Sequence, residues 1–410
     1  MKKKRIRMKY KNILVVLVFV GLLMFIPFLK KDEVKEELLS DFTGMNISEV
    51  KIYGDKHEFE VNIEYQYSDN ITKDNVIESD VNNNQINVIV SKGKINETVY
   101  REYKVNELGR VPIMMYHGII DTTENKYTGG NVDKDGYNRT ANAFREDLEF
   151  YYQSGYRMMR LIDYVNGKIN VPLGYSPIIL TFDDGNKNNF NVLGRDESGD
   201  LIIDPNCAVG ILETFKKKYP DYNVTATFFV MNGLFNQSEY NEEILKWLVD
   251  NGYDIGSHTT NHANFTEIGI NKTQEVVGKM YEKLDNILGE RYVKIIALPY
   301  GSPYKKDHAN YPYIIKGTYE DYSYETDALL RVGWESEVSP FNKTFDKYFL
   351  KRCRAYDNNG KEFDIEMVFK NLEKNRYISD GDVNRVVIKE STKDNLNKNI
   401  ENVIVYKEEE

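Results

Sequence analysis

The stretch ILTFDDGN, residues 179–186, predicts a buried strand that ends at two adjacent carboxylates. Asp183, Asp184 and a glycine directly follow the apolar run. Neighbouring like charges repel, so the pair is either an ordinary solvated turn or two groups that divide a chemical task. Alone, an Asp-Asp-Gly sequence is most often a turn, and the rest of the chain must decide.

From residue 108 onward, strand patterns alternate with helix patterns, which predicts an α/β fold with a parallel sheet, open or closed into a barrel. The expected strands are VPIMMYH (111–117), PIILTFD (177–183), VTATFFVM (224–231), YDIGSH (253–258), KIIALPY (294–300) and ALLRVGW (328–334). The expected helices are FREDLEFYYQSG (144–155), SEYNEEILKWLVDNG (238–252, capped by Ser238) and NKTQEVVGKMYEKLDNILG (271–289). Sites in such folds collect at the carboxyl ends of strands.

A second motif, SHTTNH (257–262), follows another of these strands. A helical turn would bring His258 and His262 to one side. A His-x3-His pair without partners is more often incidental than metal-binding, and without the Glu of H-E-x-x-H it disfavours a zincin protease. Two neutral nitrogens and one aspartate are the three-ligand set of a catalytic zinc site with an open position. The second aspartate would then stay free as a base, and the metal charge would offset the repulsion between the carboxylates.

The beginning of the chain predicts export. MKKKRIRMKYK carries seven basic residues and no acid, and residues 13–29 are continuously apolar. The basic cluster should stay in the cytoplasm, which places everything after the span outside. A retained signal anchor within residues 1–31 is the favoured interpretation, with a single-pass membrane protein and an extracytoplasmic catalytic domain. A cleaved signal peptide, and hence a secreted protein, is the alternative.

The charge balance disfavours nucleic acid as a partner. The net charge is −10, and the first 31 residues hold nine positive charges, so the remainder carries −19. Cys207 and Cys353 are the only cysteines in the sequence, so one disulfide bond is possible, but a scaffold of several disulfides is excluded.

Between the anchor and the α/β region, residues 32–44 read as a charged stalk and residues 45–107 as a small all-β module. Period-two alternation in HEFEVNIEYQY (57–67) and INVIV (86–90) carries that prediction, and TVYREYKV (98–105) is a further strand candidate. The module is either a spacer or a glycan-binding unit. Residues 356–410 form a C-terminal extension whose structure the sequence leaves open.

Residues 108–355 resemble the polysaccharide deacetylases, carbohydrate esterase family 4 with the NodB-homology domain. TFDDG, SHTTNH and LPYGSP carry the resemblance, in that order. IMMYHGI near the start of the region is similar to the subgroup of poly-N-acetylglucosamine deacetylases. The resemblance implies a distorted (β/α) barrel that binds Zn²⁺ or another divalent transition metal and removes N-acetyl groups from glycans.

The resemblance also assigns roles. It implies that Asp183 is the general base and that the metal ligands are Asp184, His258 and His262. Tyr300 corresponds to the tyrosine whose backbone N–H helps to hold the oxyanion.

The sequence departs from the commoner members at two places. Ala297 stands where they have an Arg that orients the base, and no His follows His308 to supply their general acid. The subgroup shares both departures and has a histidine near the start of its domain, so His117 is the candidate acid; a core histidine is the alternative.

Trp334 and Pro299 are candidate substrate-binding residues. Trp334 would stack on a sugar, although a core position fits it equally well.

The resulting hypothesis is a metal-dependent hydrolase that removes N-acetyl groups from N-acetylglucosamine residues of a cell-wall or surface polysaccharide. An O-acetyl esterase acting on another glycan is one alternative. A catalytically degenerate glycan-binding or scaffolding protein is the other, and the missing Arg and late His favour it.

Overall fold

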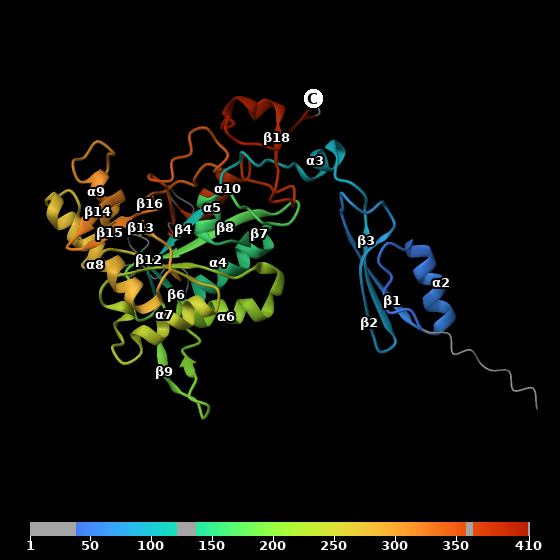
Figure 1. Cartoon of the computed structure of the whole chain (residues 1–410), viewed down its shortest axis with the longest axis horizontal. Coiled ribbons are helices and arrows are strands. Elements are labelled where there is room, and N and C mark those ends of the chain that lie inside the picture. Colours follow the sequence, from blue (N-terminus) through green and yellow to red (C-terminus); the bar gives the residue numbers. More distant parts are fainter. Residues whose placement is uncertain (1–37, 121–136, 358–363, 409–410) are drawn as a thin grey trace, which may run out of the picture. The chain divides into compact units, whose positions relative to one another are not determined.

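The computed structural model describes residues 38–120, 137–357 and 364–408, and the chain divides into two compact units, Met1–Ile95 and Asn96–Glu410 (Figure 1). The expected anchor at residues 13–29 lies outside the described residues. Within the described part, no helix has the length and apolarity to span a bilayer. Cys207 and Cys353 are both buried free thiols.

The first unit is not all-β. Helix α2 (Ile47–His57) packs on a three-stranded sheet of order β1-β3-β2, formed by β1 (Glu60–Gln66), β2 (Val76–Asn82) and β3 (Gln85–Ser91). The Asn46 side chain accepts a hydrogen bond from Ser48 N–H and so caps the helix, a signal that the strand-like alternation obscured. The apolar face of α2 meets that of the sheet through Val50, Ile86 and Val88.

The strand expected at residues 98–105 is also wrong, because this stretch is helix α3 (Glu97–Tyr103), within the second unit. The Asn96 side chain caps it by accepting from the N–H groups of Thr98 and Val99. An ion pair between Glu97 and Arg101, one helical turn apart, adds to its stability. These local interactions outweigh the β propensity of its aromatic residues.

The second unit is built on an eight-stranded sheet of order β16-β13-β12-β11-β8-β4-β17, with β7 also paired to β8. All of its strand pairs are parallel, which confirms the expected α/β class. Its strands are β4 (Ile113–Tyr116), β7 (Tyr156–Met158), β8 (Ser176–Phe182), β11 (Thr227–Val230), β12 (Asp254–Ser257), β13 (Ile295–Ala297), β16 (Ala328–Leu330) and β17 (Cys353–Arg354).

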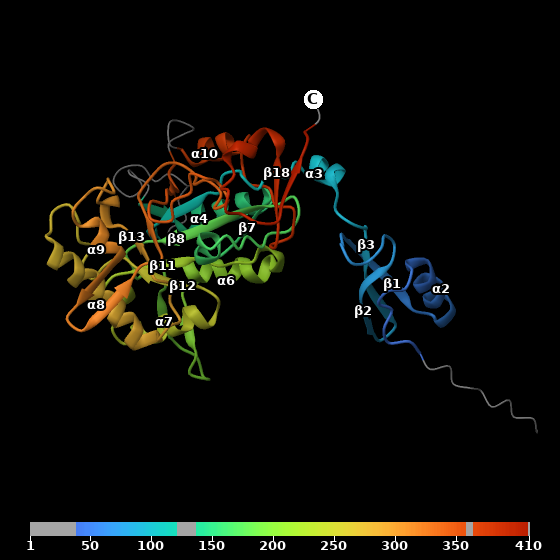
Figure 2. The ribbon, with the colours of Figure 1, turned by 45° about the horizontal axis from the view of Figure 1, so that its top comes forward.

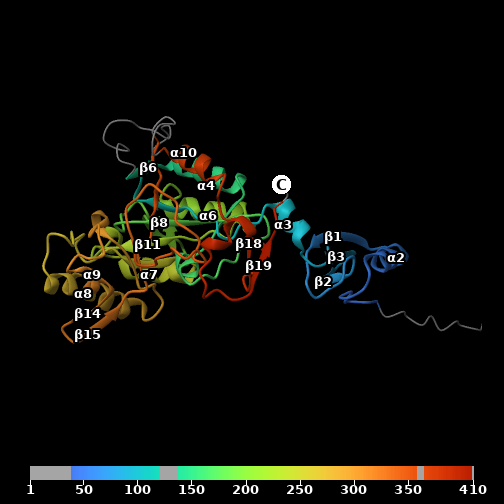
Figure 3. The same cartoon turned by 90° about the horizontal axis from the view of Figure 1, so that it is seen from above.

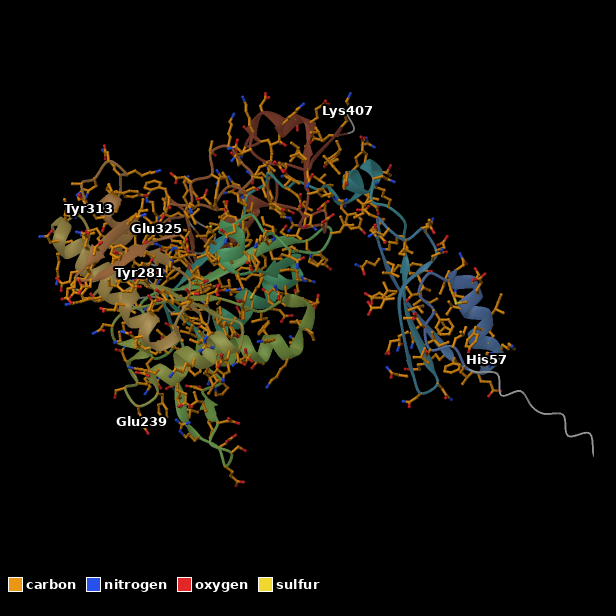
Figure 4. The ribbon with its side chains drawn as sticks, viewed as in Figure 1. His57, Glu239, Tyr281, Tyr313, Glu325 and Lys407 are labelled. Carbon is orange, nitrogen blue, oxygen red and sulfur yellow. The ribbon has the colours of Figure 1, made fainter. Side chains whose placement is uncertain are left out.

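Helices and small hairpins surround this sheet, and α6 and α7 cover one side of it (Figure 2). The helices are α4 (Ala141–Gln153), α5 (Leu161–Val165), α6 (Ala208–Lys218), α7 (Asn241–Asp250), α8 (Ile270–Leu288), α9 (Tyr311–Ile315) and α10 (Ile365–Leu372). The short strand pairs are β5 (Gly118–Ile120) with β6 (Asn138–Thr140), β9 (Val192–Arg195) with β10 (Leu201–Ile203), and β14 (Lys316–Tyr319) with β15 (Tyr322–Glu325). Tyr281 of α8, labelled in Figure 4, is buried against the last pair. Helix α7 begins at Asn241 without a Ser238 cap, contrary to expectation.

The two faces of the sheet bury different sets of residues. Leu180 and Phe182 of β8 pack with the surrounding helices, whereas Ile179 packs with the interior cluster of Ile113, Phe229, Ile295 and Leu330. Because strand side chains alternate between faces, the interior side of β8 continues through Thr181 to Asp183. The same period places His117 on the interior side of β4.

Residues 347–354 join the two edges of the sheet. Leu350 bridges to Leu330 at the end of β16, and Cys353, three positions later, pairs with Met114 of β4. The parallel sheet is therefore curled toward a barrel, and residue 352 sits at its seam.

The C-terminal extension is part of the second unit. Its strands β18 (Val386–Lys389) and β19 (Val403–Tyr406) pair in parallel and lie side by side in Figure 3. Buried Glu107 accepts hydrogen bonds from Tyr377 Oη and from the N–H groups of Asp380 and Val387. The extension thus packs on the chain entry to β4 instead of forming an appendage.

Candidate active site and metal centre

The carboxyl ends of five strands, β4, β8, β12, β13 and β16, enclose a cavity of about 310 Å³. It is lined by His117, Tyr137, Asn138, Asp183, Asp184, Asn186, His258, His262, Leu298, Tyr300 and Val332. All six predicted catalytic and metal-binding residues are in this set. These six residues come from four separate parts of the chain, and they meet at the edge of the sheet where the parallel strands end.

Asp184, His258 and His262 can bind one cation. Their ligand atoms all lie within 4.8 Å of one another. Asp184 Oδ1 is 3.4 Å from His258 Nε2 and 3.8 Å from His262 Nε2. Two ligands of a tetrahedral ion at about 2.0 Å are separated by roughly 3.3 Å, so little movement would be needed.

The hydrogen bonding of His258 fits a cation site. His258 Nδ1 lies 2.7 Å from the Ala297 carbonyl oxygen, so the proton is assigned to Nδ1, which donates. Nε2 is then a buried acceptor without a hydrogen-bond partner. It faces another acceptor, the Asp184 carboxylate, and two acceptors this close repel unless a cation lies between them.

Several residues of this site have left-handed backbone conformations. The φ angles are 75° for Asp184, 65° for Thr259, 55° for His262 and 57° for Tyr300. Such values are costly for residues other than glycine, and they cluster at functional sites. The His258–His262 segment is accordingly a strained turn and not the expected helical turn, although its two rings still lie 4.8 Å apart.

Asp183 does not share the metal-ligand set, because a buried arginine holds it. Arg352 donates from Nη1 to Asp183 Oδ1 and from Nη2 to Oδ2, both at 2.7 Å. The same guanidinium donates to Thr181 Oγ1 and to the Arg331 carbonyl oxygen. Arg352 is fully buried, so its charge and the orientation of Asp183 are both fixed.

Burial raises the pKa of Asp183, but the charge of Arg352, followed by that of His258, outweighs it and holds the pKa well below its usual range. Asp183 is therefore ionised throughout the neutral range. Burial also raises the pKa of Asp184, but the interactions with His258 outweigh burial, so the net shift is downward. Both carboxylates are available as anions.

His117 lies beside Asp183, with its Nε2 3.9 Å from Asp183 Oδ2. Burial lowers the pKa of His117 to about 4, although Asp183 and Asp184 act to raise it. Its ring packs edge-on against Tyr137 at 4.9 Å, and its carbonyl oxygen accepts a hydrogen bond from Asn189 Nδ2. His117 is thus a cavity residue and is neutral near pH 7.

The structure places the remaining predicted residues differently. The Tyr300 ring is exposed at the cavity mouth, 4.5 Å from the His262 ring. Pro299 is buried beneath it and does not line the cavity. Trp334 lines a separate cavity and stacks on Arg354 at 4.1 Å; Arg354 in turn stacks on Tyr137. Neither substrate-binding assignment is tested by this placement, and both stay predictions.

Sequence reasoning missed Arg352, Tyr137 and Asn138. The alternation in LKRCRAY (350–356) could have indicated a last strand with Arg352 facing inward, but a charged run of this length is a weak strand signal. Tyr137 and Asn138 follow a polar stretch without any periodic pattern.

The chain is similar in sequence to known proteins. Residues 171–312 match the family model described as polysaccharide deacetylase. The chain is 29% identical over 130 residues to a peptidoglycan-N-acetylglucosamine deacetylase of Bacillus cereus, which is 32% of this chain and 38% of that protein. The chain therefore aligns with about two fifths of the length of this curated relative.

Solved structures were also found. One is a polysaccharide deacetylase from Bacillus cereus, 21% identical, with a TM-score of 0.45 over 64% of this chain and 69% of that one. Another is the Streptococcus pyogenes deacetylase PplD in complex with acetate, 18% identical, with a TM-score of 0.45 over 65% and 98%.

We predict that the two adjacent aspartates separate metal binding from catalysis. Asp184→Asn removes a ligand charge and should weaken Zn²⁺ binding by at least about 10-fold, whereas Asp183→Asn and His117→Gln should bind a full equivalent. Calorimetric titration of each purified variant with Zn²⁺ measures this. Loss of Zn²⁺ from Asp183→Asn would make Asp183 a ligand and contradict the assignment.

Removing Arg352 should raise the pKa of Asp183. In Arg352→Met, the effect of burial, which raises the pKa of Asp183, would no longer be offset by the arginine charge. Arg352→Lys keeps a positive charge and is the control. A carboxyl group whose pKa is lowered by folding stabilises the folded protein at pH values above its unfolded pKa of ~4. This stabilisation is lost as the pH falls through the lower pKa of the folded state. The Asp183 carboxyl ¹³C shift, followed against pH, should titrate higher in the Met variant. An unchanged midpoint would show that Arg352 does not control this group.

Proposed function

The chain belongs to the polysaccharide deacetylase family, as its match over residues 171–312 shows, and we propose that it is a metal-dependent hydrolase that removes N-acetyl groups from N-acetylglucosamine residues of a polysaccharide. The observation that carries this proposal is one cavity in which a candidate cation site, an Arg-bound carboxylate and a histidine meet.

Asp184, His258 and His262 would hold the metal. A divalent cation there would supply Lewis-acid polarisation of the acyl carbonyl and lower the pKa of a water molecule, which offsets the low basicity of Asp183. The carboxylate of Asp183 takes a proton from the attacking water, and Arg352 keeps that carboxylate in one orientation while it does so. The Tyr300 N–H, turned by its left-handed conformation, is the proposed donor to the developing oxyanion.

His117 is the proposed proton donor to the leaving nitrogen. Because it is neutral at pH 7 in the free protein, it must first receive a proton, and Asp183 at 3.9 Å is its nearest carboxylate in the cavity. Water attacks the acyl carbon, one water proton passes to Asp183 and on to His117, and the C–N bond breaks as the nitrogen is protonated. The immediate products are acetic acid and the free amine, so atoms and charge balance; the acid then gives its proton to the amine or to solvent and becomes acetate.

The rival hypothesis of a degenerate scaffold loses its main support. It rested on Ala297, where the expected arginine is missing, and on the absence of a late histidine. Arg352, directly before β17, makes the bidentate contact to the base, and the Ala297 carbonyl orients His258. His117 occupies the cavity from β4. Both missing side chains thus have candidates for their roles elsewhere in the chain.

The polysaccharide is proposed to be peptidoglycan or a surface poly-N-acetylglucosamine. The relative from Bacillus cereus, which is named for peptidoglycan N-acetylglucosamine, supports that substrate class. A basic cluster followed by an apolar stretch at residues 13–29 supports a single-pass protein whose catalytic domain lies outside the cell membrane.

The activity test is acetate release from chito-oligosaccharide, poly-N-acetylglucosamine and peptidoglycan, assayed with Zn²⁺. The unsubstituted protein should release acetate from at least one of them. Asp183→Asn and His117→Gln should each lower kcat by about 10²- to 10⁴-fold, the usual effect of losing an acid or base. Undiminished release by Asp183→Asn would rule out the mechanism, and release from an O-acetylated glycan alone would identify an esterase.

The proposed location is tested by fractionating cells that produce the full chain. We expect the protein in the membrane fraction, resistant to salt and extracted by detergent, and digested by protease added to whole cells without an outer membrane. A chain that begins at residue 38 behind a cleavable export signal is the matched control and should be released. Recovery of the full chain in the medium, shortened at its N terminus, would instead establish a cleaved signal peptide.

A further inference from the structure

A second cavity of about 650 Å³ lies next to the catalytic one. The two share Asn138 and Asn186 in their linings, so they are adjacent. The second cavity is lined by Gly118, Ile119, Ile120, Asn138, Asn186, Lys187, Asn188, Asn191, Asp204, Asn206, Cys207 and Asn236. Nothing in the proposed mechanism uses it.

Six of these lining residues are asparagines, and the net charge of the lining is zero. The charged members are Lys187 and Asp204. The Asp204 carboxylate already accepts hydrogen bonds from Asn191 Nδ2 and from Asn206 N–H. Primary amides both donate and accept, so this lining suits a neutral ligand with many hydroxyl groups.

Asn188 is the residue that points most clearly to a ligand. Its Oδ1 is buried and has no hydrogen-bond partner, a state that buried polar atoms rarely keep unless something else satisfies them. A Cβ added at Gly118 would lie 2.4 Å from Asn138 Oδ1 and 3.1 Å from Asn188 Nδ2. Gly118 therefore leaves the room that these two amides occupy.

Hydrogen bonds hold the segment that contains Asn188 in place. The carbonyl oxygens of Asn188 and Asn189 accept hydrogen bonds from the first N–H groups of α6, Ala208 and Val209. Asn189 also donates from its side chain to the His117 carbonyl oxygen. The amide-lined wall is thus tied directly to the strand end that carries the candidate acid.

The segment that brings Asn236 to the cavity lining is strained. Leu234, Phe235 and Asn236 have φ angles of 46°, 71° and 55°, three consecutive left-handed residues of which none is glycine. Leu234 and Phe235 are buried, and the turn carries the exposed Asn236 into the cavity lining. Strain of this kind persists only where the surrounding packing imposes it, and it is concentrated at binding sites.

We propose that this amide-lined cavity is a subsite for a neutral hexosamine residue of the polysaccharide, adjacent to the residue that is deacetylated. The inference rests on the proposed function for its ligand class. The asparagines would bind ring hydroxyls and the acetamido group, and Asn188 Oδ1 would accept from one of them. Their shared lining makes the two cavities neighbouring positions on one chain of sugars.

The experiment measures binding without turnover. Fully N-acetylated chito-oligosaccharides of increasing length are titrated calorimetrically into full-length Asp183→Asn protein loaded with Zn²⁺. Asn188→Ala and Asn236→Ala are added singly to this background. Asn236 is exposed, so its variant should fold even if the variant at Asn188 does not. Asn399→Ala, an exposed asparagine in the C-terminal extension, is the matched control.

Each cavity variant should weaken the Kd of the longer oligosaccharides by about 3- to 10-fold, the effect of one or two lost hydrogen bonds, and leave the monosaccharide unchanged. The control should match the parent. The parental affinity should also be nearly constant as NaCl rises from about 0.05 to about 0.5 M, because the ligand is neutral.

Equal affinities for parent and both cavity variants would overturn the subsite, as would a parent that binds no oligosaccharide. A steep salt dependence would overturn the assignment of a neutral ligand. Acetate release by the unsubstituted protein tests the proposed function separately. A protein that binds as expected but releases no acetate would retain the subsite and refute the enzyme.

Discussion

The buried ion pair between Arg352 and Asp183 is the interaction on which the site depends. The two residues are 169 positions apart, and both are almost completely inaccessible to solvent. A buried charge without its partner costs about 3–5 kcal/mol, so neither residue is tolerated alone. Arg352 reaches Asp183 because residues 347–354 join β16 to β4 and close the curled sheet. Formation of the catalytic carboxylate's environment is therefore coupled to completion of the fold.

The sequence was sufficient for the features that depend on local periodicity. The six apolar runs after residue 108 all became strands of one parallel sheet, because each is flanked by glycine, proline or polar residues and separated by amphipathic helices. Parallel strands then bring their carboxyl ends together whatever lies between them. That geometry alone explains how Asp183, His258 and His117 were placed in one neighbourhood from spacing and strand order.

What the sequence could not supply depends on contacts between distant segments. Arg352 directly precedes the two-residue strand β17, which forms only against β4, so its local signal is negligible. The helices α2 and α3 were missed for the opposite reason: their asparagine caps are strong local signals, but the neighbouring strand-like alternation dominated. Asn188 belongs to a polar loop whose importance appears only when Gly118 and α6 surround it.

Backbone strain explains how two adjacent aspartates serve one cavity with different partners. Along a strand, consecutive side chains point to opposite faces, so an extended Asp184 would turn away from the interior that Asp183 faces. Its φ of 75° breaks the alternation and turns its carboxylate toward His258 and His262. Asp183, still in register with β8, keeps Arg352. The two neighbours can therefore serve different partners because the left-handed conformation begins at Asp184, directly after Asp183, and this strain separates a ligand from a base.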